Sequence, residues 1–208
     1  MWNVRDLNAP KKQQYLDWLI SEQKPDIVMF NETKLTSPLY LGGYYGHQTL
    51  LKRSGGCLTF SNLKAHRKVK GLGTYLNWSK VLLGGEEVHI LNVYLEPGQE
   101  SFVGKRAETV INLAKDIVKQ DAGAKIIIGG DLNGQLSKLH TFLTLAGFTP
   151  ALRAKTPTHR DGNQLDQMWV RNLQITNAIV ADPIDLVSDH NLIQVKMEAV
   201  CISRVEQV

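Results

Sequence analysis

Cysteine is scarce in this 208-residue chain, which has only Cys57 and Cys201, without the close spacing of a metal-binding cysteine motif. A disulfide framework is therefore not expected, and a reducing compartment, nuclear or cytoplasmic, fits this composition better. The chain also lacks any apolar run of roughly 18 residues, the length that a membrane-spanning helix needs. Its first residues lack the apolar segment of a secretory signal peptide. We therefore expect no membrane partner.

Neither charge nor hydrophobicity dominates the composition, since hydrophobic residues make up 43% and charged residues 21% of the chain. These shares are ordinary for a globular protein, and the length suits one domain with a full core. No internal repeat or boundary is visible, so we predict one domain over residues 1–200, with residues 201–208 as a tail or linker. The net charge of +4 suits a polyanionic partner, although many basic proteins bind no nucleic acid.

The chain begins close to its first expected core element. Met1-Trp2-Asn3-Val4 stands where a first strand should be ending. Either this strand is very short or the domain has been cut from a longer chain, and we favour the second interpretation.

Apolar residues at helical spacing predict the helices. A helix over residues 10–23 would place Tyr15, Trp18, Leu19 and Ile20 on one face. A longer helix and a short one are expected at residues 105–120 and 137–146.

Apolar runs and alternating patterns predict the strands. Strands are expected at residues 26–30, 57–62, 87–94, 125–128 and 192–199. Residues 164–170 and 173–180 are expected to form two further strands that pair with each other around Arg171-Asn172.

Acidic and amide side chains gather where the predicted strands begin or end. Glu32 follows one strand, Gly129-Gly130-Asp131-Leu132-Asn133 ends another, and Ser188-Asp189-His190 precedes the last. Hard cations such as Mg²⁺ take oxygen ligands, so this arrangement is typical of a site for a metal ion and a phosphate. Each cluster alone has a simpler interpretation, such as a capping glutamate, an Asx turn or a surface histidine. Asp166 is harder to explain in this way, because a carboxylate within an apolar strand needs a partner such as His190.

Six short motifs follow one another along almost the whole chain. They are Trp2-Asn3, Asn31-Glu32-Thr33-Lys34, Asn92-Val93-Tyr94-Leu95-Glu96-Pro97, Gly130-Asp131-Leu132-Asn133, Leu165-Asp166-Gln167 and Ser188-Asp189-His190. In this order they resemble the endonuclease/exonuclease/phosphatase superfamily. The resemblance implies an α+β fold, a four-layer α/β/β/α sandwich of two mixed β-sheets flanked by helices, with the active site at one end of the sheets.

The same resemblance implies a metal-dependent enzyme. Glu32 would hold Mg²⁺, for which Mn²⁺ is a possible substitute, and Asn3 and Asp189 would lie in or near the metal shell. In-line attack on a phosphodiester needs an activated water, a neutralised leaving oxygen and donors preset for the developing charge.

The catalytic roles also follow from this resemblance. Asp131 would orient or deprotonate the attacking water, while Asn133 would place the phosphate and Tyr94 would contact it. His190, oriented by Asp166, would stabilise the charge that grows on the phosphoryl oxygens.

One segment indicates a branch of the superfamily. Residues 157–166, Pro-Thr-His-Arg-Asp-Gly-Asn-Gln-Leu-Asp, are similar to the endonuclease domains of LINE-type (non-LTR) retrotransposons. Thr158 would be the phosphate-side threonine of those domains. Further candidates for substrate binding are His159, Arg160 and Ser188.

The resulting hypothesis is a Mg²⁺-dependent endonuclease that nicks one DNA strand and leaves a 3′-hydroxyl for target-primed reverse transcription. Its partners would be DNA and a reverse transcriptase domain in the same parent polyprotein. Repair enzymes often have an aromatic residue where this chain has Gln167, and no long lesion-binding insertion is visible. Two alternatives stay open, an abasic-site DNA repair endonuclease and a catalytically silent nucleic-acid-binding domain.

Overall fold

The computed structural model describes residues 1–48, 56–63, 67–71, 75–97, 100–133, 137–181 and 188–199. The tail predicted at residues 201–208 lies outside these ranges, so the division into a domain and a tail stays a prediction. Within the described ranges, no helix is long and apolar enough to cross a membrane.

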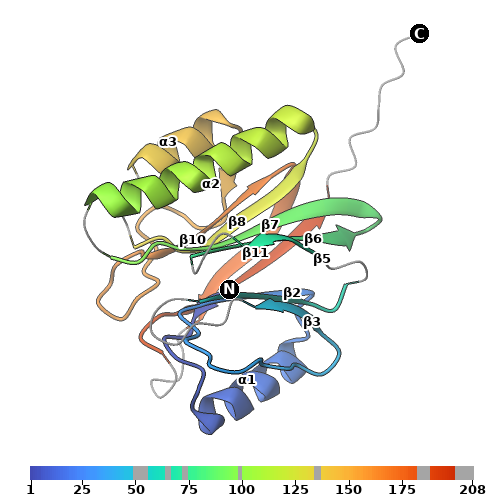
Figure 1. Ribbon diagram of the computed structural model, residues 1–208, viewed down its shortest axis with the longest axis vertical. Helices are drawn as coiled ribbons and strands as arrows, with labels where there is room; N and C mark the ends of the chain where they lie inside the picture. Colours follow the sequence, from blue (N-terminus) through green and yellow to red (C-terminus); the bar gives the residue numbers. More distant parts are fainter. Residues whose placement is uncertain are drawn as a thin grey trace.

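The chain folds into four layers, with two β-sheets face to face and helices on both outer sides (Figure 1). Helices α2 (Glu100–Gln120) and α3 (Ser137–Leu145) cover the outer face of a six-stranded sheet. Helix α1 (Pro10–Gln23) covers the outer face of a four-stranded sheet on the opposite side. The predicted α+β sandwich is confirmed.

Both main sheets are mixed, as predicted. The four-stranded sheet contains, in spatial order, β1 (Trp2–Asn3), β2 (Ile27–Asn31), β4 (Cys57–Ser61) and β3 (Tyr45–Gln48). The six-stranded sheet contains, in spatial order, β5 (Arg67–Gly71), β6 (Leu76–Leu83), β7 (Glu86–Tyr94), β8 (Lys125–Asp131), β10 (Asp166–Arg171) and β9 (Thr149–Pro150). Among these pairs, β1 runs parallel to β2 and β7 runs parallel to β8, while the others are antiparallel.

Strands β11 (Leu173–Ala181) and β12 (Leu192–Ala199) form a separate antiparallel pair. The predicted pairing of residues 164–170 with residues 173–180 is therefore wrong. Strand β10 pairs with β8 and β9, whereas β11 pairs with β12.

The turn between β10 and β11 explains why these strands separate. Asn172 has a left-handed φ of 55°, and its side chain donates a hydrogen bond to the carbonyl of Ala124 at 3.0 Å. The Arg171 guanidinium donates to the carbonyls of Ala122 at 2.8 Å and Ala146 at 3.0 Å. These bonds tie the turn to the loops before β8 and β9, so the chain leaves the six-stranded sheet instead of folding back as a hairpin.

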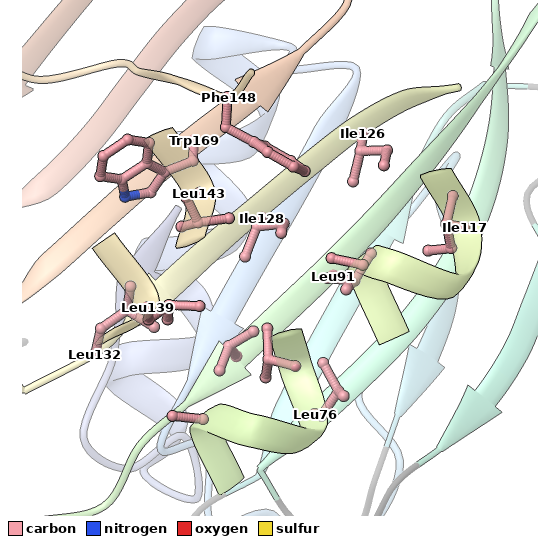
Figure 2. Close-up of a cluster of buried hydrophobic side chains, with 14 of the residues drawn as sticks. Leu76, Leu91, Ile117, Ile126, Ile128, Leu132, Leu139, Leu143, Phe148 and Trp169 are labelled. Atoms are coloured by element: carbon pink, nitrogen blue, oxygen red, sulfur yellow. The ribbon is translucent and has the colours of Figure 1, made fainter. Parts of the chain in front are cut away.

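A large apolar cluster packs α2 and α3 onto the six-stranded sheet (Figure 2). Ile126 and Ile128 of β8 are fully buried in this cluster, which also contains Leu139 and Leu143 of α3. Each buried aliphatic side chain stabilises the fold by about 1.5–3 kcal/mol relative to an exposed one. The cluster therefore fixes β7 and β8, whose last residues are Tyr94 and Asp131.

Helix α1 packs on the four-stranded sheet through Leu16 and Ile20, which are four residues apart and buried. Tyr15 and Leu19 are half-buried beside them. The predicted place of Trp18 on this face is wrong, because its side chain is 54% exposed. With 3.6 residues per turn, Trp18 lies about 200° around the helix from Leu16 and points to solvent.

Gly130 lies where β8 runs against β7, and its φ is 147°. A Cβ added there would lie 1.7 Å from the carbonyl oxygen of Val93, so even alanine requires main-chain movement. We expect Gly130→Ala to lower the free energy of unfolding by about 3 kcal/mol or more, measured by urea denaturation.

Gly147→Ala is the matched control for this substitution. Gly147 also has a positive φ, 77°, but no atom of the described residues lies within 4 Å of the added Cβ. It should therefore lose only about 1 kcal/mol. Equal losses for the two variants would contradict the steric explanation.

Candidate active site

Strands of both sheets end at the same place, and the predicted site residues lie there. In the register of the six-stranded sheet, Asp131 of β8 is opposite both Tyr94 of β7 and Asp166 of β10. In the other sheet, Asn3 of β1 is opposite Asn31 of β2. Neighbouring strands lie about 4.8 Å apart, so register brings Tyr94, Asp131 and Asp166 together in one sheet. It brings Asn3 and Asn31 together in the other.

The Asn3 side chain links the two sheets at this point. Its amide nitrogen donates hydrogen bonds to Asp131 Oδ2 at 2.8 Å and to Glu32 Oε1 at 3.1 Å. Its amide oxygen accepts the main-chain N–H of Arg5 at 2.9 Å, which fixes this orientation of the amide. Asn3 therefore lies next to Glu32, the predicted metal ligand, and holds two carboxylates side by side.

Asp131 is almost fully buried, and two further asparagines hold it. Its main-chain N–H donates to Asn31 Oδ1 at 3.1 Å, and its Oδ1 accepts the main-chain N–H of Asn133 at 3.0 Å. Burial, followed by the charge of Asp166, raises the pKa of Asp131 to about 7, against the lowering effect of His190 and the hydrogen bonds. A carboxyl group with this pKa is suited to accept a proton near neutral pH.

Asp166 and His190 lie in contact, as the sequence predicts. His190 Nδ1 is 2.7 Å from Asp166 Oδ2, and both side chains are buried. The second ring nitrogen, Nε2, faces Asp131 and lies 3.9 Å from its Oδ2. Burial lowers the pKa of His190, but the hydrogen bond and charge of Asp166 outweigh burial and raise this pKa above its usual value. Burial raises the pKa of Asp166, so both members of the pair hold a proton to higher pH than the free side chains do.

Two buried hydroxyl groups form hydrogen bonds with the main chain around the Asp166–His190 pair. Thr158 Oγ1 accepts the main-chain N–H groups of Leu165 and Asp166, both at 2.9 Å. Ser188 Oγ donates to a carbonyl of β1 at 2.7 Å and accepts the main-chain N–H of His190 at 3.1 Å. Both hydroxyl groups are engaged within the protein, and their predicted contact with substrate stays a prediction.

The loop before β10 lies against the segment that precedes β12. His159 Nε2 is 3.4 Å from Asp189 Oδ2, and the His159 ring meets the His190 ring edge-on at 4.9 Å. The main-chain N–H of Arg160 donates to the carbonyl of Asp189 at 2.9 Å, while Arg160 itself is exposed. These contacts bring two predicted substrate-binding residues to the site.

Two cations form ion pairs with carboxylates of the site. The sequence analysis did not predict these ion pairs. Arg5 forms an ion pair with Asp189, and Lys34 Nζ lies 3.1 Å from Glu32 Oε2. Arg5, Glu32 and Lys34 have left-handed φ values of 59°, 50° and 49°, so tight turns direct their side chains. Burial raises the pKa of Asp189, but its hydrogen bonds and the charge of Arg5 outweigh burial and lower this pKa. The spacing in the sequence could have indicated these ion pairs, because each cation lies two residues after a predicted site residue, Asn3 or Glu32.

Tyr94 and Asn133 border the same carboxylates. Burial, followed by the charge of Glu32, raises the pKa of Tyr94, so the phenol keeps its proton. Asn133 has a φ of 48°, and its side-chain nitrogen donates to the carbonyl of Leu95 at 2.7 Å. The hydrogen bond from the Asn133 N–H to Asp131 Oδ1 closes an Asx turn headed by Asp131, which was the simpler interpretation of this motif.

A buried amide pair joins the two sheets behind the site. Asn31 Nδ2 donates to Asn92 Oδ1 at 2.8 Å, and Asn92 Nδ2 donates to the carbonyls of Phe30 at 3.1 Å and Leu58 at 2.7 Å. Asn31 also accepts the N–H of Asp131, so the pair fixes that carboxylate. The sequence interpretation missed this role, although an amide within an apolar strand signals a need for a partner.

A model of the endonuclease/exonuclease/phosphatase family matches residues 2–190. The chain belongs to this family. The resemblance inferred from the six motifs is therefore confirmed. As the family name states, its members are nucleases and phosphatases, enzymes that act on phosphoesters.

Solved structures of the endonuclease/exonuclease/phosphatase fold match almost the whole chain. A 3′ phosphatase, NExo, from Neisseria bound to a product DNA hairpin has a TM-score of 0.76 at 15% identity, covering 95% of this chain and 97% of that chain. An AP endonuclease from Archaeoglobus fulgidus has a TM-score of 0.72 at 16% identity, with coverages of 90% and 95%. The endonuclease domain of TRAS1, a telomere-specific non-LTR retrotransposon, has a TM-score of 0.68 at 15% identity, with coverages of 91% and 92%. At these identities the likeness shows the fold alone, and no curated protein matches the sequence.

Enzymes of the endonuclease/exonuclease/phosphatase family typically depend on a divalent metal ion, and the donor set here fits one. Four carboxylates gather at the site, those of Glu32, Asp131, Asp166 and Asp189. Asp166 Oδ1 and Asp189 Oδ1 are buried and accept no hydrogen bond from the described residues. Asp131, Asp166 and His190 each place a ligand atom within 4.8 Å of the other two. Carboxylate oxygens without a donor suit a hard divalent cation, so the residues present fit such an ion.

Proposed function

We propose that this chain is a Mg²⁺-dependent endonuclease that hydrolyses one strand of DNA and leaves a 3′-hydroxyl. The observation that carries the proposal is the meeting of Asp131 with Glu32 and with the Asp166–His190 pair, where strands of both sheets end. Phosphodiester hydrolysis needs a base for the attacking water and positive or hydrogen-bonding groups for the charge that develops on oxygen. The site offers a candidate for each.

In the proposed reaction, Asp131 accepts a proton as water attacks the phosphorus atom. The bond from phosphorus to the 3′ oxygen breaks, and the departing oxygen takes a proton from solvent water, which leaves a 3′-hydroxyl on one fragment and a 5′-phosphate on the other. His190, held by Asp166, donates from Nε2 to a phosphoryl oxygen. Tyr94 keeps its proton and donates to the same group, and Asn133 positions the phosphate from the turn after β8.

Glu32 would hold the metal ion, with Asp189 and Asn3 in or near its shell, and Mn²⁺ is a possible substitute for Mg²⁺. A bound divalent cation would neutralise charge on the phosphoryl and leaving oxygens. Lys34 and Arg5, which pair with Glu32 and Asp189, keep these two carboxylates aligned.

DNA from a retrotransposon target is the substrate that we propose. Two observations support it: the retrotransposon-like segment at residues 157–166 lies against the site, and the net charge is +4. On this proposal a reverse transcriptase domain of the same polyprotein uses the 3′-hydroxyl as a primer, in the nucleus or cytoplasm.

Side-by-side cleavage of a supercoiled plasmid and an abasic duplex, with the product ends mapped, tests this function. We expect open circles with 3′-hydroxyl and 5′-phosphate ends, and no preference for the abasic duplex. Strong preference for the abasic site would favour a repair endonuclease. Complete inactivity with Mg²⁺ on both DNAs would favour a catalytically silent binding domain.

Glu32→Gln should raise the Mg²⁺ concentration needed for half-maximal nicking by about tenfold or more, because it removes the charge of the proposed ligand. A Mg²⁺ titration of the nicking rate measures this change. Glu22→Gln on the exposed surface of α1 is the matched control and should follow the unmodified chain. An unchanged titration for Glu32→Gln would remove Glu32 from the metal site.

A further inference from the structure

We propose that His159, Asp189 and His190 bind a transition-metal ion such as Zn²⁺, and that an ion held there inhibits the enzyme. One ligand atom from each of these three side chains lies within 4.8 Å of the other two. His159 Nε2 and Asp189 Oδ2 are already 3.4 Å apart. Ligand atoms around tetrahedral Zn²⁺, with bonds of about 2.0–2.2 Å, lie about 3.3–3.6 Å from one another. Small side-chain rotations therefore complete the set.

Each of the two histidines has a carboxylate behind its other ring nitrogen. His190 Nδ1 lies 2.7 Å from Asp166 Oδ2, and His159 Nδ1 lies 3.4 Å from Asp161 Oδ2. Histidines that bind metal usually donate their second ring N–H to such a carboxylate, which leaves Nε2 free for the ion. The main-chain N–H of Asp161 donates to His159 Nδ1 at 3.2 Å, so the neutral ring carries its hydrogen on Nε2. Metal binding requires the other tautomer, in which this bond is lost and Nδ1 donates to the Asp161 carboxylate.

Asp189 supplies the third ligand. Its side chain is 12% exposed, and its Oδ1 accepts no hydrogen bond from the described residues. Its Oδ2 is shared by His159 and by Arg5, whose side chain is 62% exposed and can move into solvent. Arg5 therefore acts as a competing cation that an incoming metal ion displaces.

The ligand types select the ion. Two imidazole nitrogens and one carboxylate suit Zn²⁺ or Co²⁺, whereas Mg²⁺ requires oxygen ligands. Three protein ligands with an open fourth position also fit the coordination of Zn²⁺. We therefore expect a site that millimolar Mg²⁺ does not fill.

The inhibitory effect rests on the proposed function, whereas the binding does not. In the proposed reaction His190 Nε2 donates to a phosphoryl oxygen, and a metal ion on that nitrogen removes the donor. The same ion occupies Asp189, which we place in or near the Mg²⁺ shell. Zn²⁺ should therefore inhibit nicking in the presence of saturating Mg²⁺.

Titration with Co²⁺ in the absence of DNA tests the binding directly, because a low-symmetry site containing nitrogen ligands gives visible d–d absorption. We expect such absorption in the unmodified chain, its displacement by Zn²⁺, and its persistence in excess Mg²⁺. His159→Gln should weaken Co²⁺ affinity by about tenfold to a hundredfold. Glu32→Gln, which removes the proposed Mg²⁺ ligand, should bind Co²⁺ normally. Arg5→Gln should bind Co²⁺ more tightly, because the competing cation is gone.

Three outcomes would overturn the site. These are unchanged Co²⁺ affinity in His159→Gln, loss of the absorption in Glu32→Gln alone, and weaker or equal affinity in Arg5→Gln. If His159→Gln fails to fold, nuclear magnetic resonance of the histidine rings decides instead. Zn²⁺ must then shift the signals of two imidazoles in the unmodified chain, and a shift in neither overturns the proposal.

Zn²⁺ inhibition of nicking completes the experiment, with each variant compared to its own rate without Zn²⁺. His159→Gln should require about tenfold or more Zn²⁺ for half-inhibition. Equal inhibition of both chains would contradict the inhibitory role. If the chain does not nick DNA at all, the Co²⁺ titration still measures the site, so failure of the proposed function and failure of this inference are distinguishable.

Discussion

Asp131→Asn should reduce the single-turnover rate of plasmid nicking by a factor on the order of 10²–10⁴, the usual contribution of a placed general base. Asparagine keeps the shape of the side chain, and its Oδ1 can still accept the N–H of Asn133. It cannot take a proton from water. Burial and the charge of Asp166 raise the pKa of Asp131 to about 7, which suits proton transfer near neutral pH and makes this carboxylate hard to replace.

The stability of the same variant separates a chemical loss from a folding loss. Asp131→Asn lowers the like-charge repulsion with Asp166, but it places an amide nitrogen opposite the Asn3 donor and loses that hydrogen bond. These effects oppose each other, so we expect the free energy of unfolding to change by no more than about 1.5 kcal/mol, measured by urea denaturation. Asp116→Asn, an exposed substitution on α2, is the matched control and should leave both quantities unchanged. A loss of rate below about tenfold would assign the proton transfer to another group.

The place of Asp131 could be predicted because hydrophobic pattern determines strand register. The run Ile126-Ile127-Ile128 is short and β-branched, which favours a buried strand, and β8 is buried along its whole length. Once β7, β8 and β10 align, their polar ends meet, so Tyr94, Asp131 and Asp166 become neighbours without any further information. A short motif at the end of a buried strand is therefore informative about position as well as chemistry.

The pairing of β10 and β11 could not be predicted from local pattern. Arg171-Asn172 between two apolar runs is typical of a hairpin turn. Only contacts with residues distant in sequence contradict a hairpin here. The side chains of Arg171 and Asn172 bond to carbonyls at residues 122, 124 and 146, which lie 25 to 50 residues earlier in the chain. Tertiary hydrogen bonds of this kind override a local turn preference.

Spacing alone signalled the ion pairs of Arg5 and Lys34, because the backbone conformations that direct their side chains could not be predicted. Arg5, Glu32 and Lys34 all adopt left-handed backbone conformations, which residues other than glycine rarely adopt. No local rule predicts such conformations for arginine, lysine or glutamate, so the direction of the side chains follows only from the folded site. Thr158 lies beside the Asp166–His190 pair, and its buried hydroxyl accepts two main-chain N–H groups. The sequence indicated that Thr158 lies near Asp166 but did not indicate its hydrogen-bond partners.

Asp166→Asn and His190→Ala should each reduce the single-turnover nicking rate by a factor on the order of 10²–10⁴. The double variant should be no slower than about the slower of the two single variants, because both residues serve one function. The contact of 2.7 Å between Asp166 Oδ2 and His190 Nδ1 is the structural basis of this non-additivity. If the double variant loses the product of the two single losses, the residues act independently and the proposed pairing is wrong.

The pH dependence of the rate tells whether Asp166 acts through the proton of His190. Burial alone would lower the pKa of His190, and Asp166 outweighs burial and raises it. The protonated donor therefore persists to higher pH than in a free imidazole and is lost as the pH rises through this raised pKa. In Asp166→Asn the pKa of His190 falls, so the alkaline decline of the remaining activity should move to lower pH. A purely structural role for Asp166 would lower the rate without moving that decline, so an unshifted profile would leave His190 without the partner that keeps it charged.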